Sequence, residues 1–312
     1  MRPRQLPKNG LVMVALFFTV NKWWSPDDVG GMAGLVGASL AATLIFSLVS
    51  GAVYIVNDLF DLKSDRAHPV KRNRPMASGQ VPPALGLVVA SAVFVAGVWG
   101  AFLLSMPFGL LILGYIAQSQ AYNFVLKHAV ILDVGTVAAG FVLRAVAGSL
   151  AIDGYEIGPP GETVTLDLTV SPWLYVCTGA GALFIALSKR RAELMQAGDD
   201  AERQRSILRE YSLDFIDRLL PITVTSALIA YTLYTFSGSF VVEANLPDND
   251  SMMFTIPFVA YGLFRYLYLV HQKGMGQSPE DMLLQDRPLL ATVVLWLLTA
   301  GGVLLVNARN GI

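Results

Sequence analysis

The sequence predicts an all-α protein with nine transmembrane helices in one bundle, and its composition is the first reason. Of the 312 residues, 54% are hydrophobic and 14% are charged. A typical soluble domain has roughly 25% charged residues, so this chain has too little charge to cover a water-exposed surface. The mean hydropathy of +0.55 agrees. These values exclude an ordinary soluble enzyme, a disordered chain and a coiled coil, and they make lipid the expected solvent.

Nine apolar stretches are candidates for membrane-spanning helices, each of which needs about 20 apolar residues. They lie at 10–24, 33–56, 84–104, 107–126, 130–150, 172–188, 219–239, 253–271 and 288–308. The first is the weakest, because it is short and contains Asn21 and Lys22. A signal peptide is the alternative for it, but no small-x-small cleavage site follows. We therefore expect a retained helix and a single domain over residues 1–312.

Lysine and arginine occur in alternate connections between the predicted spans. The N-terminus, 57–83 and 189–218 are basic, whereas 151–170 and 240–252 contain acids but no Lys or Arg. The positive-inside rule then predicts a plasma (inner) membrane protein whose N-terminus and two long connections are cytoplasmic. The net charge of −1 gives no broad basic field, so a nucleic-acid partner is not expected.

The most informative stretch is acidic and follows the second predicted span. Asp58, Asp61 and Asp65 are spaced i, i+3, i+7, which places three carboxylates on one face of a helix. Anions at a helix C-terminus are unfavourable, so a cation must offset them. We expect these three aspartates to be the catalytic residues and, together with Asn57, to hold Mg²⁺, which takes oxygen ligands. The alternative is a solvated, negatively charged helix end.

Basic residues follow the acids within one short connection. Lys71, Arg72 and Arg74 come directly before Pro75. Carboxylates for a metal ion and cations for phosphate oxygens are the two requirements of a Mg²⁺-diphosphate site. The alternative is that these cations serve only the positive-inside signal.

The pattern Asn-Asp-x-x-Asp-x-x-x-Asp at 57–65, followed by the basic residues and Pro75, resembles the first signature of the UbiA superfamily of intramembrane prenyltransferases. The resemblance extends to nine spans with two large cytoplasmic connections. The usual second aspartate motif, of DxxxD type, is missing. The corresponding stretch, 187–194, contains Lys189, Arg190 and Arg191 instead, and guanidinium pairs well with phosphate. Glu193 lies four residues after Lys189, so the two can share a helix face.

One branch of the superfamily, the polyprenyl-phosphate phosphoribosyltransferases of decaprenyl type, is similar in further motifs. These motifs lie at 2–9, 65–69, 121–128, 144–148, 189–194, 211–212 and 279–287. The resemblance implies transfer of phosphoribosyl from phosphoribosyl pyrophosphate to a polyprenyl phosphate, with Mg²⁺ as cofactor and pyrophosphate released, for a cell-envelope glycan precursor. A homo-oligomer is left open.

Polar residues inside predicted spans add to the candidate site. Asp133 and Arg144 are eleven residues apart in the fifth span, about three helical turns, so both can face one cavity or form a structural pair. Intramembrane charges by default face a polar interior. Gln118 and Tyr122 share a face of the fourth span, and Lys127 either reaches the site or snorkels. The predicted substrate-binding residues are Lys8, Asn9, Lys71, Arg72, Arg74, Gln118, Tyr122, Lys127, Arg144, Lys189, Arg190, Glu193 and Tyr211.

Two other functions compete with phosphoribosyl transfer. An aromatic prenyltransferase that uses a prenyl diphosphate would keep a second aspartate motif, which is missing here. A membrane transporter or lipid carrier would favour inverted repeats and broken helices at midplane, whereas the acids and bases of this chain gather at one face.

Overall fold

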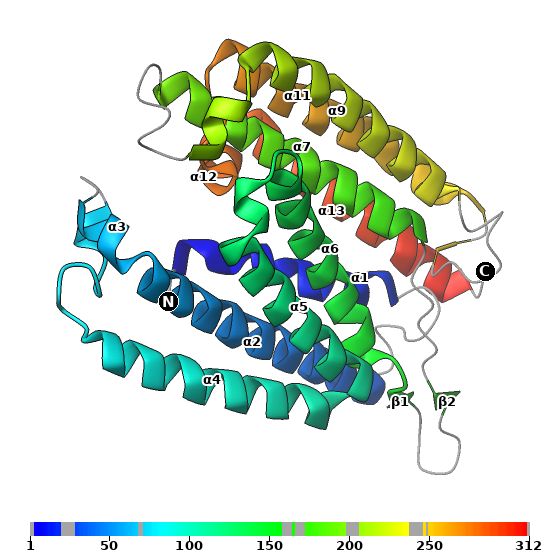
Figure 1. Cartoon of the computed structure of the whole chain (residues 1–312). Coiled ribbons are helices and arrows are strands. Elements are labelled where there is room, and N and C mark those ends of the chain that lie inside the picture. Colours follow the sequence, from blue (N-terminus) through cyan, green and yellow to red (C-terminus); the bar gives the residue numbers. More distant parts are fainter. Residues whose placement is uncertain are drawn as a thin grey trace.

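Long helices dominate the computed structural model of the chain, which describes residues 3–19, 29–67, 71–157, 164–165, 172–197, 206–236, 246–247 and 249–310. They pack into one bundle (Figure 1). The described strands are a two-residue antiparallel pair, β1 (Glu156–Ile157) and β2 (Val164–Thr165). The helices are η1 (Pro3–Met13), α1 (Val14–Thr19), α2 (Val29–Phe60), α3 (Leu62–Ala67), η2 (Lys71–Asn73), α4 (Pro83–Leu104), α5 (Met106–Phe124), η3 (Leu126–His128), α6 (Leu132–Ile152), α7 (Pro172–Ala197), η5 (Ser206–Glu210), α9 (Leu213–Thr235), η6 (Ser251–Thr255), α11 (Ile256–Gln272), α12 (Pro279–Gln285) and α13 (Arg287–Asn310), where η marks a 3-10 helix.

Each of the nine predicted spans overlaps a described helix, although residues 20–24 of the first span and 237–239 of the seventh lie outside the described residues. The count of nine membrane crossings is not confirmed. Five helices are long and apolar enough to cross a bilayer: Gly30–Phe60, Pro83–Leu104, Leu132–Ile152, Ser251–Gln272 and Arg287–Ala308. The segment Lys8–Thr19 is apolar but shorter. The helices α5, α7 and α9 each carry polar residues toward one end, which lowers their mean hydropathy. The protein is therefore an integral membrane protein with at least these five apolar helices.

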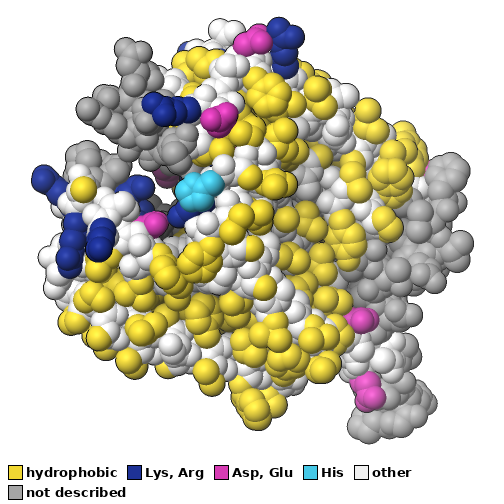
Figure 2. All heavy atoms as spheres, in the orientation of Figure 1, with side chains coloured by type: hydrophobic (Ala, Val, Ile, Leu, Met, Phe, Trp, Pro, Cys, Tyr) yellow, Lys and Arg dark blue, Asp and Glu magenta, His cyan; other side chains and the backbone are white. Residues whose placement is uncertain are grey.

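The outward faces of the helices are suited to lipid. On α4, Val95 is 72% exposed and Leu103 is 73% exposed, which would be unfavourable in water. Figure 2 shows hydrophobic side chains over most of the visible surface, with Lys and Arg gathered at the end of the bundle that carries α3. The opposite end carries β1 and β2 (Figure 1). The segregation of charge along the sequence thus becomes a segregation in space.

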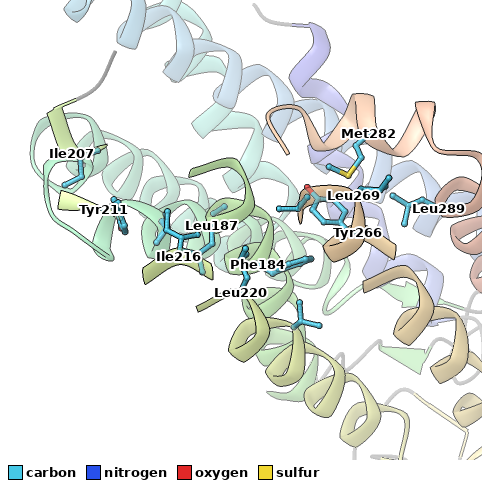
Figure 3. Packing of buried hydrophobic residues seen from close by; sticks show 14 residues of the cluster. Phe184, Leu187, Ile207, Tyr211, Ile216, Leu220, Tyr266, Leu269, Met282 and Leu289 are labelled. Carbon is cyan, nitrogen blue, oxygen red and sulfur yellow. The ribbon is translucent and has the colours of Figure 1, made fainter. Parts of the chain in front are cut away.

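Two groups of helices form the core. One joins η1, α2, α5 and α6 around Val12, Phe46 and Phe108. The other joins α7, α9 and α11 with the start of α13, and its side chains include Phe184 and Leu220 (Figure 3). Because α6 packs against both η1 and α7, it is the central wall between the groups.

Arg265, in the eighth predicted span, serves this packing. Its guanidinium donates to both carboxylate oxygens of Asp286, at 3.1 and 2.7 Å, which ties α11 to the start of α13. The hydrogen bond from Arg265 lowers the pKa of the Asp286 carboxyl. Asp286 also accepts from the backbone N–H of Leu289 at 2.9 Å, so this pair fixes a helix start.

Candidate active site

The acidic helix end is nearly continuous across the boundary between α2 and α3. The N–H of Asp61 donates to the carbonyl of Asn57 at 2.9 Å, and the N–H of Asp65 donates to the carbonyl of Asp61 at 2.8 Å. These i to i−4 bonds keep the three carboxylates in helical register. Their environments differ, because the side chain of Asp65 is 2% exposed, that of Asp58 is 15% exposed and that of Asp61 is 43% exposed.

Side-chain cations offset the repulsion between these carboxylates. One nitrogen of Arg74, Nη1, lies 3.1 Å from Asp58 Oδ1 and 2.6 Å from Asp65 Oδ2. Lys127 Nζ lies 3.7 Å from Asp61 Oδ1. The N–H of Arg74 donates to the carbonyl of Lys71 at 2.9 Å, an i to i−3 bond that places Arg74 directly after the short helix η2. The expectation that a cation must sit at this helix end is therefore correct.

The carboxylates partly fit a metal ion. Within the described residues, no cluster of three or more His, Cys, Asp or Glu side chains has a metal-binding arrangement. Oxygens of Asp58 and Asp65 nevertheless converge on a single cationic nitrogen of Arg74. A divalent ion such as Mg²⁺ is bound by hard oxygen ligands of this kind. It can take the place of the Arg74 guanidinium between the two carboxylates once that guanidinium moves aside.

A cavity of about 160 Å³ opens beside the acidic helix end. It is lined by Lys8, Val53, Tyr54, Asn57, Tyr115, Gln118, Ser119, Tyr122, Asn123, Thr136, Val137, Gly140, Phe141 and Arg144. Five predicted site residues thus meet here from η1, α2, α5 and α6, which lie far apart in the sequence. Asn57 joins the cavity to the carboxylates.

Arg144 lies in this cavity as a buried cation, with 7% of the residue exposed. Its guanidinium donates to Asn9 Oδ1 at 3.0 Å, to the Gly140 carbonyl at 2.6 Å and to Tyr115 Oη at 3.1 Å. All three acceptors are neutral, and in the described part of the chain no carboxylate pairs with Arg144. A buried charge is costly unless it is compensated. The cavity is therefore electrostatically prepared for an anion.

Small residues let η1 approach α6 closely enough to build this site. A Cβ atom at Gly148 would lie 2.0 Å from the carbonyl oxygen of Val12, so no other residue fits this crossing without a shift. The close approach brings Asn9 to Arg144, and the Asn9 amide is held by Ser47 at 3.0 Å and by Ser50 at 3.3 Å.

On α5, the predicted pair Gln118 and Tyr122 both line the cavity. The amide of Gln118 donates to the carbonyl of Thr136 at 2.6 Å, which fixes α5 against α6. One turn further on, Asn123 donates to Asn57 Oδ1. Lys71 and Arg72 do not line the cavity, and Arg72 is exposed.

The three cations at the start of the second long connection lie on the last part of α7, and their environments differ. Lys189 is exposed, whereas Arg190 is 4% exposed and Arg191 is 9% exposed. Arg191 Nε donates to Asp217 Oδ1 at 2.6 Å, which links α7 to α9. Arg190 Nη1 bonds to Glu193. The partner of Glu193 is therefore Arg190, whereas the sequence predicted that Glu193 shares a helix face with Lys189. These placements leave a phosphate-binding role for Lys189, Arg190 and Glu193 as a prediction.

Asp133 does not share a cavity with Arg144, and that expectation is wrong. Asp133 is fully buried, and its Oδ2 lies 3.2 Å from Arg190 Nε, at ion-pair distance. Its Oδ1 accepts from the hydroxyl of Tyr211 at 2.6 Å. Burial and this hydrogen bond raise the pKa of Tyr211 to about 12, so Tyr211 is a neutral donor at physiological pH. Tyr211 does not line the described cavity.

Sequence reasoning missed several residues of the cavity wall. Tyr54, Tyr115 and Phe141 all line it, yet an aromatic residue in an apolar run ordinarily contacts lipid. Thr136 could have been found, because it is polar within a span. Tyr54 also lines a second groove, of about 410 Å³. That groove lies between α2 and α4, with apolar walls and with Asp58 and Arg74 at its polar end.

The fold and this site define an integral membrane protein with a cation-lined cavity beside an acidic helix end. The sequence pattern of the UbiA prenyltransferase family matches residues 11–283, and the chain belongs to this family. The decaprenyl-phosphate phosphoribosyltransferase of Mycobacterium tuberculosis is 31% identical, covering 96% of this chain and 91% of the relative. The enzyme of the same name from Mycolicibacterium smegmatis is 30% identical, covering 96% of this chain and 89% of the relative.

A solved structure shares the fold. It is a UbiA homologue from Archaeoglobus fulgidus bound to DMAPP and Mg²⁺, with a TM-score of 0.66 and 15% identity, covering 96% of this chain and 98% of the other. The all-α, UbiA-like architecture that the sequence predicts is therefore confirmed.

Proposed function

We propose that this protein is a polyprenyl-phosphate phosphoribosyltransferase. It transfers the 5-phosphoribosyl group of phosphoribosyl pyrophosphate to a polyprenyl phosphate of decaprenyl type and releases pyrophosphate, for a cell-envelope glycan precursor. The relatives that carry this activity in their names match almost the whole chain at 30% and 31% identity. The structural observation that carries the proposal is the buried cation Arg144, which faces a cavity without a carboxylate partner among the described residues.

The residues of the cavity act by binding and orienting phosphate groups. Arg144 and Lys8 attract a phosphate of the substrates, and Gln118 and Tyr122 orient it with neutral groups. An oxygen of the lipid phosphate then attacks the anomeric carbon of the ribose, and the bond from that carbon to pyrophosphate breaks. A phosphate monoester is already ionised near pH 7, so the chain needs no strong general base.

The acidic helix end faces the leaving pyrophosphate. Asn57, Asp58, Asp61 and Asp65 would hold Mg²⁺, which neutralises the charge that develops on pyrophosphate. Arg74 must then leave the two carboxylates that it now bridges, and its guanidinium becomes free to donate to phosphate oxygens. Lys127 stays near Asp61 and adds a second mobile cation.

We also propose the arrangement in the membrane. Residues 1–312 form one catalytic domain in the plasma membrane, with the N-terminus and the connections 57–83 and 189–218 in the cytoplasm. The Lys and Arg side chains at the end of the bundle that carries α3 support this orientation (Figure 2). The polar donor then enters from the cytoplasm, and the lipid phosphate arrives from the bilayer.

A single incubation tests the function. Purified protein in detergent is given Mg²⁺, labelled phosphoribosyl pyrophosphate and polyprenyl phosphates of several lengths. We expect label in the lipid fraction and an equal amount of pyrophosphate. Consumption of a prenyl diphosphate with an aromatic acceptor, without labelled lipid, would instead favour the aromatic prenyltransferase.

A further inference from the structure

The turn between η3 and α6 contains a backbone conformation that its residue does not favour. Ile131 has φ 69° and ψ −42°, although it is not a glycine and its side chain is branched at Cβ. L-residues rarely adopt positive φ, and a β-branched residue there is a genuine outlier. Such a conformation persists only where the surrounding structure holds it. The side chain of Ile131 is 54% exposed, so its own packing does not supply that hold.

The hydroxyl of Tyr211 holds this turn. It accepts a hydrogen bond from the N–H of Ile131 at 2.8 Å and donates one to Asp133 Oδ1 at 2.6 Å. The Tyr211 hydroxyl therefore bonds both to the backbone of Ile131 and to the side chain of Asp133, two residues further on. Asp133 is fixed in turn by Arg190, whose Nε lies 3.2 Å from its second carboxylate oxygen.

The ring of Tyr211 has little freedom to move. Tyr211 is 5% exposed and belongs to the buried cluster that includes Ile207, Ile216 and Leu187 (Figure 3). These two hydrogen bonds of the Tyr211 hydroxyl, called the clamp below, are thus anchored in the second core group.

The clamped turn joins two parts of the site. On its N-terminal side, η3 carries Lys127, whose Nζ lies 3.7 Å from Asp61. On its C-terminal side, the next turn of α6 carries Thr136, whose carbonyl accepts from Gln118 in the cavity wall. We therefore expect a change in the turn to move Lys127 relative to the acidic helix end.

We propose that Tyr211 is a positioning residue for the transfer reaction, because its hydroxyl holds the strained turn at Ile131 and so keeps Lys127 at the acidic helix end. This inference rests on the proposed function. It gives Tyr211 of the second long connection a mechanical role, in which its hydroxyl acts through the turn and does not contact substrate.

The test compares kcat and KM for both substrates in Tyr211→Phe, which removes one hydroxyl and keeps the ring. We expect kcat to fall about ten- to hundredfold, the effect of losing a hydrogen bond to a charged group, with little change in either KM. Tyr231→Phe is the matched control. Its hydroxyl is also buried and bonds to Thr255 at 2.6 Å and to Trp296 at 2.7 Å, but these residues do not line the cavity.

Two double variants separate positioning from a general loss of folding. Ile131→Gly in the Tyr211→Phe background should restore part of kcat, because glycine adopts positive φ without a clamp. Lys127→Ala combined with Tyr211→Phe should be no worse than the more damaging single variant, since both act on one element. Full kcat in Tyr211→Phe, or losses that multiply with Lys127→Ala and do not respond to the glycine, would overturn the proposal.

Hydrogen exchange provides a readout that does not depend on turnover. The N–H of Ile131 should be protected in the wild-type protein and should exchange faster in Tyr211→Phe. If the wild-type protein transfers no phosphoribosyl, the proposed function fails while this measurement still tests the clamp. Unchanged exchange in the variant would refute the clamp whatever the reaction.

Discussion

Replacement of Arg144 by glutamine tests the idea that the cavity receives a phosphate group. The guanidinium now makes three hydrogen bonds, at 3.0, 2.6 and 3.1 Å, to Asn9, the Gly140 carbonyl and Tyr115. A glutamine amide has two N–H donors, so it can retain some of these bonds but not all three. It removes the positive charge entirely. The ligand-free protein also loses the cost of burying a cation that has no anionic partner among the described residues, so we expect its Tm to change little.

The effect on substrate should be much larger. A charge-assisted contact to phosphate contributes about 1.5–3 kcal/mol. At about 1.4 kcal/mol per decade, Arg144→Gln should lose about ten- to hundredfold in kcat/KM. Binding can be measured without turnover. At a ligand concentration of about 100 times Kd, the free energy of unfolding rises by about 2.7 kcal/mol. If Kd rises about a hundredfold, the same concentration contributes only about 0.4 kcal/mol.

The assay combines kcat/KM with the thermal shift induced by phosphoribosyl pyrophosphate or by pyrophosphate alone. Arg218→Gln is the matched control, because its side chain is 77% exposed and forms an i, i+4 pair with Asp214 at 3.0 Å. Such surface pairs contribute little, so the control should behave as the wild-type protein does. If Arg144→Gln kept both its kcat/KM and its ligand-induced shift, the cavity would not be a phosphate site.

Three further outcomes are expected. Asp58→Asn and Asp65→Asn should each abolish transfer, and EDTA should do so reversibly with Mg²⁺; full turnover in EDTA would contradict the metal assignment. Lys189→Ala should lose about ten- to hundredfold in kcat/KM, and Arg203→Ala, outside the described residues, should lose little; equal small losses would indicate a generic basic connection. A cysteine at Gly161, also outside the described residues, should react with a membrane-impermeant reagent on intact cells, and labelling only after permeabilisation would reverse the topology.

The positions of the helices could be predicted from the sequence because hydropathy is a local property. Each predicted span overlaps a helix in the described part of the chain, and the spacing of Asp58, Asp61 and Asp65 correctly indicated a cation at that helix end. The number of membrane crossings is harder to predict from the sequence, because α5, α7 and α9 mix apolar and polar residues. In such helices, burial against neighbours replaces burial in lipid, and composition alone cannot distinguish the two.

The partners of the charged residues could not be predicted, because they depend on which helices pack together. Asp133 and Arg144 are about three turns apart on α6, which suggested one shared face. However, α6 is buried by η1 on one side and by α7 on the other. Arg144 therefore meets Asn9 from the N-terminus, and Asp133 meets Arg190 from α7. Neither contact follows from spacing within a helix.

Burial also explains why the two long connections use their cations differently. Arg74 bridges Asp58 and Asp65 with its side chain 25% exposed, so water or a hard cation can take its place at modest cost. Arg190 is 4% exposed and lies against the fully buried Asp133. Its removal would leave a buried carboxylate without a counter-ion, which is strongly destabilising. The first connection is thus suited to exchange of ligands, and the second is suited to holding a turn in place.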